Sequence, residues 1–218
     1  MRVHRFLDGG QAPTLGKVVC VGRNYAEHAK ELGHAVPERP LLFMKPATSV
    51  VPLEEPIHWP VEEGICHHET ELSVLIGTTL CRAHAEEARH AIIGWGIGLD
   101  LTLRDLQDKL KKAGHPWERA KAFDGAAPMS PFLRTDQWPK DWQDVHFGLL
   151  IDGVERQRGH TADMLMPILA LLVHISHTFT LCPGDVVMTG TPAGVGPLVS
   201  GQQLTLTLHD RVFTSSVA

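Results

Sequence analysis

The chain has 218 residues, of which 43% are hydrophobic and 21% are charged, and it carries a net charge of −5. This length fits one compact domain with a sizeable hydrophobic core. A negative net charge argues against a general binder of nucleic acids or of anionic membranes.

Cysteine usage and apolar segments indicate the compartment. The four cysteines are scattered with no CxxC spacing, so we expect reduced thiols rather than a disulfide framework or a zinc knuckle. The first residues, MRVHRFLDGGQAP, contain no apolar signal region. The most apolar helical stretch, MLMPILALLV, is about half the ~20 residues that a membrane span needs. We therefore expect a cytoplasmic protein with no membrane partner.

The first elements alternate between strand and helix. Residues 1–16 are expected to form an N-terminal arm or edge strand, and the apolar run KVVCVG at 17–22 predicts a buried strand. A short helix should follow, with Asn24 as its N-cap and Gly33 as its stop. The run LLFMKPATSV at 41–50 predicts a second strand, with Lys45 at its end before Pro46.

His28 and Glu31 lie three residues apart on that short helix, so they share a face. The common interpretation of such a pair is a surface contact worth ~0.2–0.5 kcal/mol. The functional interpretation is a histidine base that the carboxylate orients, which would also raise the pKa of the histidine. A short polar helix between two strands could also act as a lid.

The stretch HHETELSVLIG at 67–77 predicts the start of a strand with two acids on one side. Side chains alternate along a strand, so Glu69 and Glu71 face the same way, with Cα atoms roughly 6–7 Å apart. If they face the interior, a proton, a basic residue or a metal ion must neutralise them; the common alternative is that both face water. His67 has the same parity as Glu69, so a histidine ligand stays open, although a supporting role is favoured.

A polar cluster is predicted after the helix at about 83–93. The strand-like segment 94–101 is apolar and rich in glycine but carries Asp100. Asp100, Arg104 and Gln107 fall at i, i+4 and i+7, on one side of a helix that should begin at Asp100. A lone acid at such a corner is more often an N-cap, but here it faces an Arg and a Gln.

Lysines follow in two settings. Lys109, Lys111 and Lys112 are expected on a solvated outer face with no function. Lys121 lies among small and apolar residues in the loop-rich segment 115–133. Its ammonium group could extend to solvent, the more common case, or it could point at an anionic substrate.

The last third predicts two hairpins around one helix. Asp152-Gly153 is the turn signal of a hairpin at 145–159, and a second alternating hairpin should turn at His209-Asp210. Strands dominate, helices are few, and no βαβ rhythm occurs. The sequence therefore predicts a β-dominated α+β fold, a mixed β-roll or sandwich with a few peripheral helices.

Between the hairpins, residues 161–178 predict an apolar helix interrupted near Pro167, with His174 and His177 as surface or core residues rather than ligands. The segment GDVVMTGTPAGVGPL at 184–198 predicts a short strand and a glycine/proline loop. Backbone N–H groups of such a loop could receive a carboxylate or an oxyanion.

The three acids Glu69, Glu71 and Asp100 have no cysteine and no compelling histidine beside them. Oxygen-only ligands select a hard cation, Mg²⁺ or Mn²⁺ with Ca²⁺ possible, and disfavour zinc. Three carboxylates leave up to three octahedral positions open, which is typical of a catalytic site.

Six strings then occur in a characteristic order and spacing: VVCVGRNYAEHAKELG, LLFMKPAT, HHETELSVLIG, GLDLTLRDLQ, KKAGHPWERAKAFD and GDVVMTGTPAGVGPL. By these strings the chain resembles the fumarylacetoacetate hydrolase family, and within it the short acylpyruvate hydrolases and their counterparts with oxaloacetate decarboxylase activity. The resemblance runs from about residue 17 to residue 208. One departure is SGQQL at 200–204, where many members carry an acid after the glycine.

The resemblance implies a catalytic domain over 17–218 with a mixed β-sandwich roll, usually dimeric, with one Mg²⁺ or Mn²⁺ per site. It implies Glu69, Glu71 and Asp100 as metal ligands and His28 with Glu31 as the catalytic pair on a mobile lid. Lys121 would stabilise the enolate, and Lys45 would support the site. The implied substrate-binding residues are Arg23, Arg104, Gln107 and Thr191.

The expected function is hydrolysis of the C–C bond of acylpyruvates, such as fumarylpyruvate, to pyruvate and a carboxylic acid. The alternative is an oxaloacetate decarboxylase or keto–enol tautomerase that uses the same metal site. A third hypothesis is a metal-stabilised binding protein for 2-oxo acids. The expected partner is a small 2-oxo acid and a second copy of the chain, with no nucleic acid.

Overall fold

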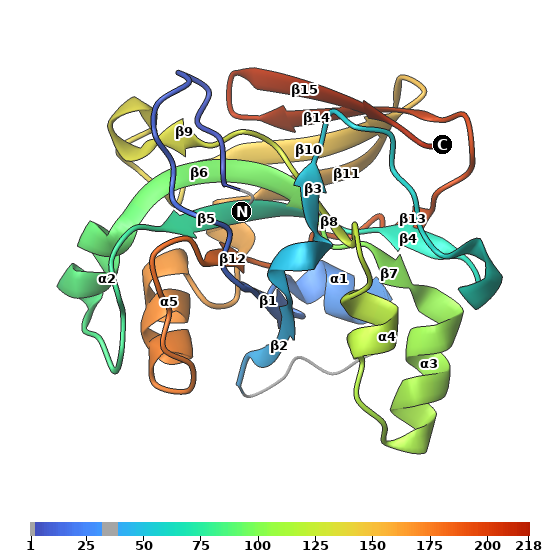
Figure 1. Cartoon of the computed structure of the whole chain (residues 1–218), viewed down its shortest axis with the longest axis horizontal. Coiled ribbons are helices and arrows are strands. Elements are labelled where there is room, and N and C mark those ends of the chain that lie inside the picture. Colours follow the sequence, from blue (N-terminus) through green and yellow to red (C-terminus); the bar gives the residue numbers. More distant parts are fainter. Residues whose placement is uncertain (1–2, 32–38) are drawn as a thin grey trace.

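A computed structural model describes residues 3–31 and 39–218. The described part of the chain is mostly β-strand with a few short helices, which lie at the periphery (Figure 1). This confirms the predicted β-dominated α+β class. A long curved sheet runs through the middle of the molecule, and a second sheet packs against it (Figure 1).

The main sheet is mixed. Neighbouring strands pair antiparallel except β1 with β12 and β3 with β8, which run parallel. Seven of its eight described strands follow one another in a single order, and the eighth, β9, pairs with β6 at the side of that order. In spatial order the strands are β2 (Leu41–Lys45), β1 (Val18–Gly22), β12 (Val186–Met188), β5 (Thr70–Ile76), β6 (Ile92–Leu99), β8 (Ala127–Met129) and β3 (Val50–Pro52), with β9 (Leu133–Arg134) beside β6.

Both faces of the main sheet are covered, which explains why its strands are continuous apolar runs. In β1, Val19 and Val21 belong to the larger hydrophobic core, whereas Val18 and Cys20 belong to a smaller one on the opposite face. This split follows the two-residue alternation of a strand. The N-terminal arm closes the smaller core with Phe6, whose backbone pairs with Phe132.

Two smaller sheets complete the fold. The four-stranded sheet consists of the two predicted hairpins side by side and contributes to the larger core. The three-stranded sheet pairs the segment just before Glu69 with the segment just after Asp100 and with part of the glycine/proline loop. The strands are β11 (Val154–His160), β10 (His146–Ile151), β14 (Gln203–Leu208) and β15 (Arg211–Ser216) in the first, and β13 (Gly196–Pro197), β4 (Cys66–His68) and β7 (Thr102–Leu103) in the second.

Both hairpin turns were placed correctly from the sequence. Asp152, Gly153 and His209 have positive φ angles of 52°, 78° and 52°. Such angles match the tight turns that connect twisted antiparallel strands, and glycine, aspartate and histidine tolerate them better than most residues.

The helices are α1 (Ala26–Glu31), α2 (Ala85–Ala91), α3 (Arg104–Ala113), α4 (Glu118–Lys121) and α5 (Ile168–Ser176).

The predicted helix starting at Asp100 was wrong in its start. α3 begins at Arg104, because Thr102 and Leu103 pair with β4 as the short strand β7. Arg104 and Gln107 do share a face of α3, but Asp100 precedes the helix and is not its N-cap.

The strand expected within 41–50 ends at Lys45, before Pro46, as predicted: β2 ends at Lys45, and a 3-10 turn at Ala47–Ser49 follows Pro46. Proline has no N–H for a sheet ladder, and its carbonyl instead accepts the N–H of Ser49 at 3.0 Å.

Asn24 does not cap α1. Its side chain reaches across the chain, donating to the carbonyls of Met166 and Thr189 at 3.1 and 2.9 Å and accepting the N–H of Met166. The expected stop at Gly33 lies outside the described residues.

The helix expected over 161–178 begins only after Pro167, at Ile168, and Thr161–Asp163 is a 3-10 turn. Proline is tolerated at a helix start, where its missing N–H leaves no hydrogen bond broken.

All four cysteines are free, as expected. Within the described ranges, no helix combines the length and apolar character that a transmembrane span requires.

Candidate active site

The three predicted acids come together in the interior. Carboxylate oxygens of Glu69, Glu71 and Asp100 lie within 4.8 Å of one another, and all three side chains are buried. Glu69 lies between β4 and β5, Glu71 on β5, and Asp100 directly after β6. Because β5 and β6 pair antiparallel, the N–H of Asp100 donates to the carbonyl of Glu69 at 2.8 Å. The sheet therefore holds the acids at one strand end.

Three buried or half-buried cations surround this acid cluster. Lys121 Nζ lies 2.9 Å from Glu69 Oε2 and 2.6 Å from Asp100 Oδ2. Lys45 Nζ lies 2.7 Å from Asp100 Oδ1, and the Arg104 guanidinium pairs with Glu69. Lys121 is 3% exposed, so it does not extend to solvent. Of the two settings open from the sequence, the structure places its ammonium group among the acids.

The electrostatics of the acid cluster are uneven. Burial alone would raise the pKa of Glu69, but Lys121 and Arg104 outweigh burial and hold that pKa well below its usual range. Burial opposes the charge of Lys121, yet Asp100 and Glu69 raise its pKa. Burial, followed by the charges of Asp100 and Glu69, raises the pKa of Glu71 well above its usual range. No ion pair among the described residues reaches Glu71, whose Oε2 accepts the Gly190 N–H at 2.7 Å.

These residues fit a hard divalent cation. The donors are all carboxylate oxygens, the type that Mg²⁺ and Mn²⁺ prefer. Octahedral coordination with bonds of about 2.1 Å separates neighbouring oxygens by roughly 3 Å, so small side-chain shifts from the 4.8 Å limit are enough. A cation would also take the place of the proton that the raised pKa assigns to Glu71. His67 is not a member of the acid cluster.

The predicted histidine–carboxylate pair lies beside the acid cluster on α1. His28 Nδ1 is 3.5 Å from Glu31 Oε2, which is an ion-pair distance longer than a hydrogen bond. Burial, partly offset by Glu69 and Glu31, lowers the pKa of His28, so its imidazole is neutral near pH 7. Glu31 is fixed from its other side, because the Gly194 N–H donates to both of its oxygens at 3.1 Å.

The glycine/proline loop thus receives carboxylates, as its backbone pattern predicted, and they belong to the protein itself. Gly190 holds Glu71, and Gly194 holds Glu31. Thr191 of the same loop does not line the cavity described below. Its hydroxyl donates to the Thr70 carbonyl at 2.9 Å and accepts from Gln157 Nε2 at 2.8 Å. The side chain of Thr191 ties the loop to β5.

A small cavity of about 40 Å³ adjoins the acid cluster. This volume holds roughly two to four waters at about 10–15 Å³ each. Most of the predicted site residues meet here, together with an apolar wall that includes Phe43 and Trp117. The predicted residues that line it are Arg23, His28, Glu69, Arg104, Gln107 and Lys121.

Two lysines lie closer to the acid cluster and its cavity than the sequence predicted. Lys45 was given a supporting role, but it is fully buried and pairs directly with Asp100. Lys111 was expected on a solvated face, which is wrong: it lines the cavity. The signal was present, because Lys111 is seven residues after Arg104 and four after Gln107, on the same face of α3. Gln157, which binds Thr191, gave no such signal, since it lies in the polar run of β11.

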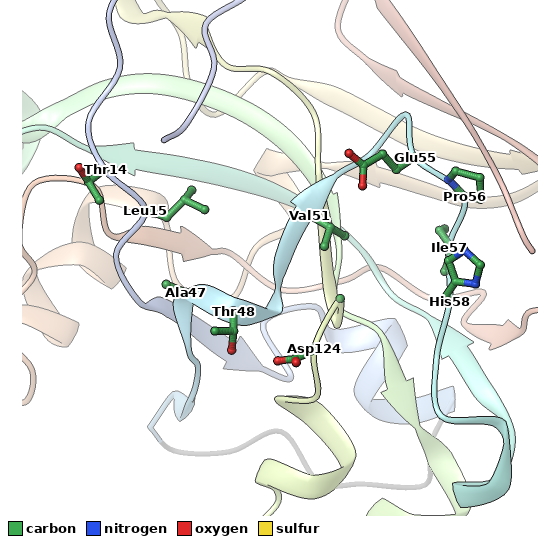
Figure 2. A pocket seen from close by; sticks show the side chains of 11 residues that line it. Thr14, Leu15, Ala47, Thr48, Val51, Glu55, Pro56, Ile57, His58 and Asp124 are labelled. Atoms are coloured by element: carbon green, nitrogen blue, oxygen red, sulfur yellow. The ribbon is translucent and has the colours of Figure 1, made fainter. Parts of the chain in front are cut away.

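A larger cavity of about 640 Å³ lies elsewhere (Figure 2). Its lining joins the N-terminal arm at Thr14 and Leu15 to the segment around Glu55 and His58 and to Asp124. None of the predicted site residues lines it. The larger cavity is therefore not the one that lies beside the acid cluster and His28.

Comparisons with known proteins agree with this geometry. The pattern of the fumarylacetoacetate (FAA) hydrolase C-terminal family matches residues 17–215. The chain is 52% identical over 203 residues to oxaloacetate tautomerase YcgM of Escherichia coli K12, covering 93% of each chain. It is 43% identical over 196 residues to the mitochondrial oxaloacetate tautomerase fahd-1 of Caenorhabditis elegans, covering 90% of this chain and 91% of that one.

Among solved structures, the chain is similar to fumarylpyruvate hydrolase from Pseudomonas aeruginosa in complex with Mn²⁺ and pyruvate. The TM-score is 0.94 at 34% identity, and the match covers 100% of this chain and 95% of that one.

Proposed function

The chain belongs to the fumarylacetoacetate hydrolase family, and from that premise we propose that it is a metal-dependent oxaloacetate keto–enol tautomerase. Two relatives that are 52% and 43% identical are named for this activity. The observation within the molecule that carries the proposal is the buried, neutral His28 in a cation-lined cavity beside three buried acids.

Glu69, Glu71 and Asp100 would hold the cation, and Mg²⁺ or Mn²⁺ fits their oxygens best. When bound, such a cation polarises the keto and carboxylate oxygens of a 2-oxo acid and makes the protons on C3 more acidic. Lys121 holds Glu69 and Asp100 in place through its ion pairs, and Lys45 holds Asp100.

The cavity charge suits a dianion such as oxaloacetate. Arg23, Arg104 and Lys111 line the wall around His28. Burial and the neighbouring Arg104 lower the pKa of Lys111, and an anionic ligand would relieve both effects. Oxaloacetate is larger than the few waters that the cavity holds, so its binding requires the lining side chains to move apart.

His28 is the proposed base. As a neutral imidazole it would accept a proton from C3, and the imidazolium so formed would return one proton to the keto oxygen, directly or through a water, so that the ketone becomes an enol without loss of atoms. The reverse steps return the ketone. Glu31, held by Gly194, orients the imidazole and favours its protonated form during the transfer.

Acylpyruvate hydrolysis is the second candidate. The His28–Glu31 pair also suits deprotonation of a water that attacks a distal carbonyl, and the Pseudomonas aeruginosa fumarylpyruvate hydrolase supports this assignment by likeness. Both candidate reactions fit the family and the acid cluster. They differ in whether a water molecule attacks a carbonyl carbon of the substrate.

A pair of assays separates them. Enol–keto conversion of oxaloacetate is followed by the ultraviolet absorbance of the enol, and acylpyruvate cleavage by loss of β-diketone absorbance, each with Mg²⁺ and with EDTA. The proposal predicts fast, EDTA-sensitive conversion of oxaloacetate. Cleavage of fumarylpyruvate without accelerated conversion of oxaloacetate would reject it in favour of the hydrolase.

A further inference from the structure

A second cluster of metal-ligating side chains lies on the four-stranded sheet. Asp144, His146 and His160 each offer one ligand atom, and these three atoms lie within 4.8 Å of one another. Asp144 lies two residues before β10, His146 begins β10 and His160 ends β11, whereas the acid cluster lies at the start of β5 and the end of β6 (Figure 1). The proposed function uses none of the three.

A β-bulge creates this arrangement. A regular hairpin through the Asp152-Gly153 turn would place Gly159 opposite His146. The register shifts between Leu149 and Leu150, so His146 faces His160 instead. Directly opposed residues of an antiparallel pair point to the same side of a sheet. The two imidazole rings accordingly stack, with centroids 4.1 Å apart and planes at 18°.

The backbone around the pair is fixed by hydrogen bonds. The N–H of Thr161 donates to the Val145 carbonyl, and the N–H of Val145 donates to Thr161 Oγ1, both at 3.0 Å. The His209 N–H donates to the His146 carbonyl at 2.8 Å. The carboxylate of Asp144 approaches the pair, with Oδ1 3.0 Å from His160 Nε2. The two histidines thus lie on a hydrogen-bonded strand pair, which favours a preformed site, and Asp144 reaches it from the segment just before β10.

We propose that Asp144, His146 and His160 bind a borderline divalent transition ion, Zn²⁺. Two imidazole nitrogens and one carboxylate oxygen are a common zinc donor set, with water in a fourth position. Zinc bonds of about 2.0–2.1 Å require donors roughly 3.3 Å apart in a tetrahedron. Asp144 and His146 are exposed, so small rotations of their side chains bring the donors to that spacing. Mg²⁺ and Mn²⁺ prefer the oxygen donors of the acid cluster instead.

Equilibrium dialysis tests the proposal on tag-free protein at micromolar free Zn²⁺ with millimolar Mg²⁺. The variants are His146→Asn and His160→Asn, and the control is His90→Asn, which removes an exposed histidine of α2. The proposal predicts that the first two bind one zinc fewer per chain, or bind it at least about tenfold more weakly, while the control matches the wild type. Imidazole NMR signals of His146 and His160 should shift on zinc addition in the wild type.

Equal zinc stoichiometry and affinity in the wild type and in both cluster variants would overturn the proposal. The Mg²⁺-dependent conversion of oxaloacetate should be unchanged in His146→Asn, because the proposed zinc site shares no residue with the cavity around His28. The zinc proposal therefore stands or falls independently of the proposed function.

Discussion

The described residues contain two groups of side chains that could hold a metal ion, and the surroundings of the two groups are opposite. The acid cluster is buried, uses only oxygen, and has two lysines and an arginine paired to Glu69 and Asp100. The cluster of Asp144, His146 and His160 is largely exposed and mixes nitrogen with oxygen. Burial explains why lysines and an arginine pair with Glu69 and Asp100. Buried charges must be compensated by other protein groups, whereas water solvates exposed charges.

The contrast fits the two proposed roles. The paired cations and acids would form a preorganised field that polarises a bound 2-oxo acid. Asp144, His146 and His160 line neither of the two cavities described above, and their donors suit simple ion binding. Substitutions that disturb the buried acid cluster should therefore have larger effects than substitutions that disturb exposed or isolated groups.

The largest expected effect is on Lys121. Replacing it in Lys121→Met leaves Glu69 and Asp100 short of a buried positive charge, which should lower the free energy of unfolding by about 3–5 kcal/mol in EDTA. Urea unfolding measures this. Mn²⁺ should restore part of the loss, since a divalent cation supplies the missing charge.

The matched control for that experiment is Lys109→Met, which removes an exposed lysine of α3 and should change stability by less than about 0.5 kcal/mol. If Lys121→Met were as stable as the wild type in EDTA, the claimed compensation of buried charge would be wrong.

His28→Asn should separate chemistry from metal binding. Loss of the proposed base predicts a fall in oxaloacetate tautomerisation of about 10²–10⁴-fold, whereas Mn²⁺ affinity should stay near that of the wild type. Steady-state kinetics and Mn²⁺ titration measure the two effects. A variant with normal kcat would remove His28 from the mechanism.

Glu71→Gln and Glu69→Gln should differ from each other in EDTA. Burial and the neighbouring acids keep Glu71 protonated, so a neutral glutamine should preserve the metal-free stability, whereas Glu69→Gln breaks two ion pairs and should be less stable. Both should lose the stabilisation by Mn²⁺, which is about 2.7 kcal/mol at a concentration of 100 times Kd. Thermal unfolding with and without Mn²⁺ checks this; equal metal-free losses would contradict the assignment.

The smallest expected effect concerns a buried histidine outside both groups. His4 is buried against Phe132, and burial lowers its pKa. Because the folded pKa lies below the ordinary value near 6.5, its contribution to stability is present in full above that value. The contribution is lost as pH falls through the folded pKa.

Urea midpoints at pH 7.5 and pH 5.0 measure this dependence. His4→Gln keeps a donor for the Gly184 carbonyl but does not titrate, so its midpoint should fall less over this range than that of the wild type. An equal fall in both proteins would show that His4 is not the source.

Local chemistry explains which parts of the fold were predictable. The hairpin turns follow from residues that tolerate positive φ, and Glu69 and Glu71 follow from strand alternation. Asp100 was placed at the site correctly but in the wrong element, because the start of α3 depends on pairing of Thr102 and Leu103 with β4. The partners of that short strand lie far away in the sequence, and no local pattern encodes them.

The parts that were missed depend on long-range packing. The ion pair of Lys45 with Asp100 forms only when β2 approaches the end of β6. The pairing of His146 with His160 depends on a one-residue bulge, which turn residues alone do not specify. The hydrogen bonds of Thr191 also depend on long-range packing, because its hydroxyl accepts from Gln157 of another sheet, and its contact with substrate stays a prediction.

The most direct test of the central claim is anomalous diffraction from a crystal grown with Mn²⁺ and oxalate, a stable mimic of a 2-oxo acid. The account predicts a manganese peak bonded to carboxylate oxygens of Glu69, Glu71 and Asp100, with oxalate in remaining positions. A manganese peak elsewhere, with these three acids still paired only to lysine and arginine, would contradict it.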